Sequence, residues 1–131
     1  MTQGMNHLGL AVRDLDASVA FFTDILGWSE TGRDQSYPRS VVSDGTCRLT
    51  LWQVAQEPEP RGFDRCRNIG LHHLALEVSS RAELDEMHAR IAACPDAEIE
   101  FAPEPMGDGP RYHMMFAEPG GIRLELVWPG G

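Results

Sequence analysis

The chain has 131 residues and a mass of 14.5 kDa, of which 42% are hydrophobic and 24% are charged, the composition of an ordinary globular domain. Eleven basic residues, all of them arginine, stand against 20 acidic residues, and the formal net charge is −9. This acidic balance argues against a nucleic-acid partner, which would need a positive surface, and the lack of lysine excludes Schiff-base catalysis and the lysine-dependent phosphate loop.

The sequence also bears on where the protein acts. Its apolar runs are too short to span a membrane, and the first residues lack the basic region and apolar core of a signal peptide. Three cysteines without paired spacing favour a reduced protein over a disulfide framework. We therefore expect a cytoplasmic protein with no membrane partner.

The first predicted elements are a strand and a helix. Alternating apolar residues predict a strand over 8–12. A helix then begins near Asp14 or Asp16 as N-cap and ends at Gly27, with one apolar face that includes Phe22. Three further strands are expected over residues 28–32, 41–43 and 48–54.

The same order of elements follows a proline-containing connector over residues 55–68. A strand over 74–78 precedes a helix that begins near Ser79 or Ser80, has Glu83 in its first turn, and ends before Pro95. The closing strands are expected over residues 98–101, 112–117 and 122–128.

Two pairs of segments show that this order is an internal repeat. Residues 6–12 read NHLGLAV, and residues 72–78 read HHLALEV, 66 positions later. Residues 37–51 return as residues 112–126, an offset of 75, with Tyr, Gly, Arg and two Leu in register. The second copy therefore carries a nine-residue insertion, which we place in the Pro- and Gly-rich run 102–110.

The predicted fold is α+β, with two pseudo-symmetric βαβββ modules that form a cupped, half-open mixed β-barrel with the helices outside. We expect a single domain over residues 1–131, with module one at about 1–54 and module two at about 69–131. The alternative architecture is one mixed sheet with two helices.

Strand alternation predicts which side chains share the face opposite the helices. The leucines of each first strand pack under a helix, so His7 and His73 point to the other face, beside the small residues Gly9 and Ala75. The last strand places Glu125 on that same open face. Two imidazoles and one carboxylate form a set that binds a divalent ion (Fe, Mn, Ni or Zn) and leaves positions open for substrate.

Other side chains complete the predicted site. His113 is the first candidate for proton transfer, because its parity places it beside Glu125. Tyr112 is a second catalytic candidate, although its opposite parity favours a structural role. The residues expected to contact substrate are Thr50, which occupies the position of Glu125 in the first copy, together with Met115 and Arg111. His72 points away from His73 and is interpreted as a supporting residue, and His88 as a solvated helix residue.

The segments NHLGLAVRDLDASVAFFTDILGW, HHLALEV and FAEPGGIRLELVW together resemble the vicinal oxygen chelate superfamily. This superfamily contains glyoxalase I, extradiol dioxygenases, methylmalonyl-CoA epimerase, fosfomycin-resistance thiol transferases and bleomycin resistance proteins. The resemblance covers nearly the whole chain and implies metal ligands at His7, His73 and Glu125. It also implies a homodimer, whose metal site lies within one chain or is completed by the partner chain.

The resemblance does not decide among reactions. It implies a metal-dependent enzyme acting on a small molecule with vicinal oxygens, by a lyase, isomerase, extradiol-type dioxygenase or thiol transferase reaction. Glyoxalase I and the epimerase carry Glu or Gln where this chain has Thr50, which argues against glyoxalase I activity. The alternative is a metal-free protein that binds a small molecule or antibiotic and confers resistance.

Overall fold

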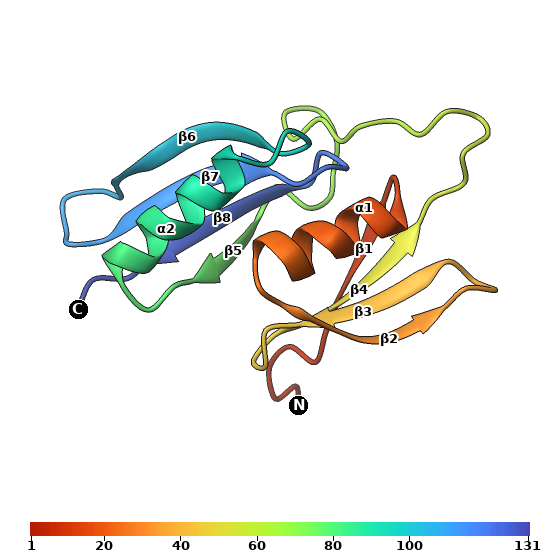
Figure 1. The fold of residues 1–131 in the computed structure, drawn as a ribbon, viewed down its shortest axis with the longest axis horizontal. Coiled ribbons are helices and arrows are strands. Elements are labelled where there is room, and N and C mark those ends of the chain that lie inside the picture. The colour runs from red at the N-terminus through yellow and green to blue at the C-terminus, as the bar shows by residue number, and fades with distance from the viewer. The chain divides into compact units, whose positions relative to one another are not determined.

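The computed structural model describes residues 1–131. Each half of the chain forms a four-stranded sheet with one helical segment (Figure 1). The chain divides into two units, Met1–Arg61 and Gly62–Gly131. The α+β class and the two βαβββ modules are thereby confirmed.

The first module has a mixed sheet in the order β1-β4-β3-β2. The pairing at one edge, between β1 and β4, is parallel, and the other two pairings are antiparallel. The elements are β1 (Leu8–Val12), α1 (Leu15–Ala20), the π-helical turn η1 (Phe21–Ile25), β2 (Ser29–Asp34), β3 (Arg39–Ser43) and β4 (Arg48–Gln53).

The second module repeats this topology in the order β5-β8-β7-β6, again with a parallel pair, β5 and β8, at one edge. Its elements are β5 (Leu74–Glu77), α2 (Arg81–Ala92), β6 (Glu98–Pro105), β7 (Tyr112–Ala117) and β8 (Arg123–Trp128). No helix in either module has the length and apolar character needed to cross a membrane.

Strand register confirms the equivalence of the first and last strands of the two modules. Gly9 lies opposite Thr50 in the first sheet, and Ala75 lies opposite Glu125 in the second. Thr50 and Glu125 therefore occupy equivalent positions. His7 and His73 each stand two residues before the small residue of their strand.

The predicted equivalence of Tyr37 with Tyr112 is wrong by one residue. The β7–β8 turn has five residues where the β3–β4 turn has four, so His113, opposite Val127, corresponds to Arg39, opposite Trp52. The insertion in the second module also lies in three places rather than one, because the offset between equivalent residues rises in three steps. It is 66 between Gly9 and Ala75, 69 between Ser29 and Glu98, 74 between Ser43 and Ala117, and 75 between Arg48 and Arg123.

The helix starts follow the predicted caps. Asp14 accepts a hydrogen bond from the Ala17 amide at 3.0 Å, and Ser80 accepts one from the Glu83 amide at 3.0 Å. Each satisfies an amide that has no partner within its helix. The π-helical end of the first helix was not predicted; its wider turn buries the adjacent residues Phe21 and Phe22 together.

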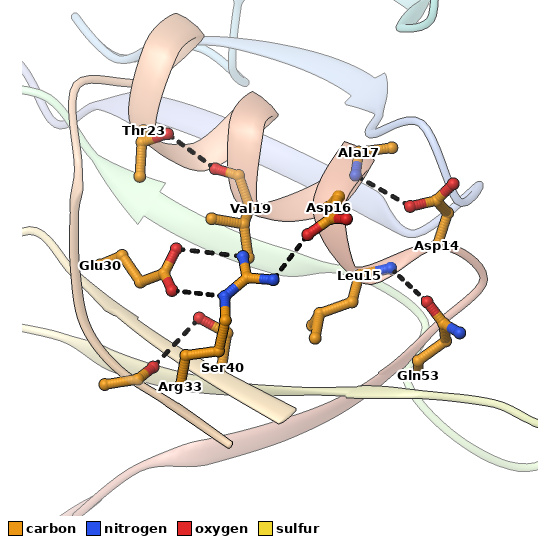
Figure 2. A network of polar contacts seen from close by, with 11 residues as sticks. Asp14, Leu15, Asp16, Ala17, Val19, Thr23, Glu30, Arg33, Ser40 and Gln53 are labelled. Carbon is orange, nitrogen blue, oxygen red and sulfur yellow. Dashed lines mark hydrogen bonds and ion pairs between the residues drawn. The ribbon is translucent and has the colours of Figure 1, made fainter. Parts of the chain in front are cut away.

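Side-chain contacts tie α1 to the strands of the first sheet (Figure 2). Gln53, the last residue of β4, accepts a hydrogen bond from the Leu15 amide at 2.9 Å. Arg33 on β2 donates to Glu30 at 2.7 Å and to Asp16 on α1 at 2.6 Å. These contacts fix the helix against one face of the sheet.

Each module buries the apolar residues that face its helix. The buried strand residues include Leu10, Val12, Leu49 and Leu51 in the first module and Leu76, Met114, Phe116, Leu124 and Leu126 in the second. Gly9 and Ala75, on the other face, are exposed. The predicted alternation along the first strands is confirmed.

Candidate metal site

A buried carboxylate lies on the sheet face of the second module that carries no helix. Glu125, in β8, is only 4% exposed, and its neighbours across the strands are Ala75 and Met115. A carboxylate removed from water needs charged or hydrogen-bonding partners. The side chains around Glu125 therefore define what this face can bind.

His73 is one partner of this carboxylate. It stands just before β5, and its Nε2 lies 3.2 Å from Glu125 Oε2. The strand register brings the two together, because Ala75, two residues further on, lies opposite Glu125 and its methyl side chain leaves room above the strand. His73 and Glu125 are thus predicted ligands that the structure places side by side.

His113 holds the other oxygen of Glu125. Its Nδ1 donates to Glu125 Oε1 at 2.6 Å, and its ring packs on Phe101 with 4.9 Å between centroids. The His113 side chain is 18% exposed and that of His73 is 35% exposed. Each oxygen of the carboxylate therefore lies close to a histidine ring, one from the residue before β5 and one from β7.

A second layer of polar residues supports His73. Its Nδ1 lies 2.8 Å from His72 Nδ1, and Arg123 reaches both the ring and the carbonyl oxygen of His72 at 3.3 Å. Arg123 also donates to both carboxylate oxygens of Glu100 on β6, at 3.1 and 2.7 Å. Sequence reasoning had not found Glu100, which lies where the β6–β7 register shifts.

Two of these groups have shifted pKa values. The hydrogen bonds from Arg123 hold the pKa of Glu100 below its ordinary value. Partial desolvation, together with the positive charge of Arg123, lowers the pKa of His72. The negative charge on Glu100 and the neutral form of His72 are both favoured by Arg123.

The equivalent position of the first module holds a different set of groups. His7 Nδ1 lies 2.7 Å from Asn6 Oδ1. Thr50, in place of a glutamate, accepts a hydrogen bond from the indole N–H of Trp52 at 3.1 Å. A Cβ atom at Gly9 would come within 3.3 Å of Thr50 Oγ1, so the glycine leaves room for this threonine.

The other residues predicted for the site differ in how close they lie to Glu125. Met115, 6% exposed, is the cross-strand neighbour of Glu125. Tyr112 is not brought to Glu125: its ring lies under the Arg81 guanidinium of α2, 3.8 Å from the ring centroid. Arg111 belongs to the β6–β7 connection, where its carbonyl oxygen accepts from the Met106 amide.

No set of three or more His, Cys, Asp or Glu residues is arranged in the structure to hold a metal ion. Two of the three predicted ligands, His73 and Glu125, lie together in the second module. The third, His7, belongs to the first module.

The sequence is similar to one protein family and to individual proteins of known sequence. The model of the glyoxalase/bleomycin resistance protein/dioxygenase superfamily matches residues 4–126. The chain is 29% identical to a 2-epi-5-epi-valiolone epimerase from Actinomyces sp., with 94% of this chain and 78% of the relative covered. It is 34% identical to the uncharacterized protein YqjT of Bacillus subtilis, with 95% and 98% covered.

Solved structures share the fold. A glyoxylase/bleomycin resistance protein/dioxygenase domain from Frankia sp. EAN1pec is 27% identical, with a TM-score of 0.82 and coverage of 98% of this chain and 93% of that one. A variant of the fosfomycin resistance protein FosX from Listeria monocytogenes, complexed with Mn(II) and 1S,2S-dihydroxypropylphosphonic acid, is 22% identical, with a TM-score of 0.75 and coverage of 100% and 93%.

Proposed function

The chain belongs to the glyoxalase/bleomycin resistance protein/dioxygenase superfamily, and we propose from this premise that it is a divalent-metal-dependent enzyme. Its substrate is a small molecule with two neighbouring oxygen atoms. The observation that carries the proposal is the buried carboxylate of Glu125, with His73 at one of its oxygens. We propose His7, the repeat-equivalent histidine, as the third ligand.

The residues present suit such an ion. Imidazole nitrogen and carboxylate oxygen bind Fe, Mn, Ni or Zn. Two ligands of one ion, each about 2.0–2.2 Å from it, lie roughly 3 Å apart when they are adjacent. His73 Nε2 and Glu125 Oε2 are 3.2 Å apart, which is the spacing that two such ligands need.

The chain's own residues have separate tasks in this proposal. A bound divalent ion supplies a Lewis acid that stabilises negative charge on substrate oxygen. His113 holds Glu125 through Nδ1, which leaves its Nε2 to exchange a proton with substrate. Met115 beside Glu125, Thr50 on the first sheet and Arg111 are the proposed substrate contacts.

The similarity to a protein named as an epimerase favours an isomerase among the reaction classes of the superfamily. An isomerase of this kind moves a proton, and His113 is the group near Glu125 that is suited to that task. We propose that the protein works as a cytoplasmic homodimer, as the family resemblance implies.

Metal content tests the proposal directly. The purified protein is loaded with Mn(II), Fe(II), Ni(II) or Zn(II), desalted, and analysed by inductively coupled plasma mass spectrometry. We expect a bound ion in the wild type and loss of most of it in Glu125→Gln, His73→Ala and His7→Ala. His88→Ala, a matched change on α2, should keep full occupancy.

The contrary result points to a different class of protein. A wild type that holds no divalent ion above trace, and whose ion content equals that of Glu125→Gln, would be a metal-free small-molecule-binding protein. If metal is bound, anaerobic Fe(II) reconstitution followed by a panel of catechols separates a dioxygenase from an isomerase or lyase.

A further inference from the structure

An unbroken row of polar contacts leads to His73 from the outer strand of the second sheet. Glu100 on β6 accepts from Arg123 at 2.7 and 3.1 Å, and Arg123 Nη1 lies 3.3 Å from His72 Nδ1. His72 Nδ1 in turn lies 2.8 Å from His73 Nδ1. At the end of the row, His73 Nε2 faces Glu125 Oε2 at 3.2 Å.

The chemistry of the first member decides the proton positions of the others. A guanidinium group only donates hydrogen bonds, so His72 Nδ1 beside Arg123 is an acceptor without a proton. The contact between the two imidazoles then requires His73 to donate from its own Nδ1. In a neutral imidazole with its proton on Nδ1, the Nε2 atom carries a free lone pair.

We infer that Arg123 and His72 are positioning residues that hold His73 in this tautomer, so that its Nε2 lone pair faces Glu125. Two acceptor atoms 3.2 Å apart repel each other unless a cation lies between them. The row of contacts therefore prepares His73 as a metal ligand, a role that rests on the proposed function. Outer partners of this kind fix the ring orientation and tautomer of a ligating histidine.

Glu100 holds Arg123 in place for this role. Its carboxylate takes the Nε and Nη2 donors of the guanidinium, which leaves Nη1 for His72. The Arg123 side chain is 17% exposed, so solvent competes little for these donors.

In the first module, a different residue holds His7 in the same tautomer. Asn6 stands where His72 stands in the second module, 66 positions earlier, and its Oδ1 lies 2.7 Å from His7 Nδ1. A carbonyl oxygen only accepts, so His7 also carries its proton on Nδ1 and presents Nε2. Two unlike side chains at equivalent positions thus select one tautomer.

The tautomer can be measured without any metal. Long-range ¹H–¹⁵N correlation spectra of the ¹⁵N-labelled, metal-free protein at about pH 8.5, above the ordinary pKa of histidine, report which ring nitrogen of His73 carries the proton. We expect Nδ1 in the wild type and in His72→Asn, which keeps an acceptor as Asn6 does. A mixture of tautomers is expected in His72→Ala and in Arg123→Met.

Metal affinity gives the second measurement. Competition with a chelator should show that Zn(II) binds about 10–100-fold more weakly to His72→Ala than to the wild type, the usual effect of removing such a partner. His72→Asn should restore most of the affinity. Circular dichroism of each variant shows whether it is folded.

Two results would overturn the inference: a proton on Nε2 of His73 in the wild type, or an unchanged Zn(II) affinity in His72→Ala. Failure of the proposed function looks different. In that case the wild type binds no metal, while the spectra of the metal-free protein still report the tautomer and decide the inference by themselves.

Discussion

At the level of single residues, the two modules differ at the position opposite the small residue of the first strand. Glu125 in one module is buried between two histidines, while Thr50 in the other accepts from Trp52. Strand alternation in the sequence was sufficient to predict that His73 and Glu125 would meet. It could not predict the contact between Arg123 and Glu100, because a shift of register in β6 sets that contact.

Replacing Thr50 by Val should affect stability and leave metal binding intact. The valine has no oxygen for the Trp52 indole N–H, and the loss of one such hydrogen bond costs about 0.5–1.5 kcal/mol of the free energy of unfolding. Urea denaturation measures this cost, and mass spectrometry measures the metal content. A fall in metal content with unchanged stability would instead make Thr50 a ligand.

At the level of elements, helix starts were more predictable than helix ends. Asp14 and Ser80 are N-caps because their short side chains satisfy nearby amides, and this chemistry is local enough to be recognised in the sequence. The π-helical turn Phe21–Ile25 has no such local signal. Its wider turn buries Phe21 and Phe22 next to each other, and such burial depends on the packing of the whole module rather than on the local sequence.

The contact of Arg33 with Glu30 and Asp16 should make the first module sensitive to acid (Figure 2). Hydrogen bonds from Arg33 lower the pKa of Glu30 below its ordinary value of 4.5. A lowered carboxyl pKa stabilises the folded state above the unfolded-state pKa, and this contribution is lost as the pH falls through the folded-state pKa.

We therefore expect Glu30→Gln to cost about 0.5–1 kcal/mol at pH 7, the value of a partly exposed ion pair. The difference from the wild type should persist down to about pH 5 and shrink at lower pH. Urea denaturation at a series of pH values measures it. Glu86→Gln on the exposed surface of α2 is the control, and an equal pH dependence in that variant would contradict the assignment to Glu30.

At the level of the whole molecule, most of the predicted fold and site came from the internal repeat. The pairs of equivalent positions, His7 with His73 and Thr50 with Glu125, follow from two sequence offsets and hold in the strand register. The extra residue in the β7–β8 turn moved His113 opposite Val127. Matching letters could not show this, because a chance pair of tyrosines masked the change of register.

Metal binding should also stabilise the folded chain as a whole. An ion that binds only the folded state at a concentration of about 100 times its Kd adds about 2.7 kcal/mol, which for a chain of this length raises the Tm by roughly 10 °C. Differential scanning fluorimetry with and without Mn(II) or Zn(II) measures this gain. Glu125→Gln should abolish the gain, because the neutral amide is a poor ligand, while His88→Ala should keep it. A gain of equal size in Glu125→Gln would mean that the stabilising ion binds away from Glu125, and the centre would then have to be sought among the other histidines.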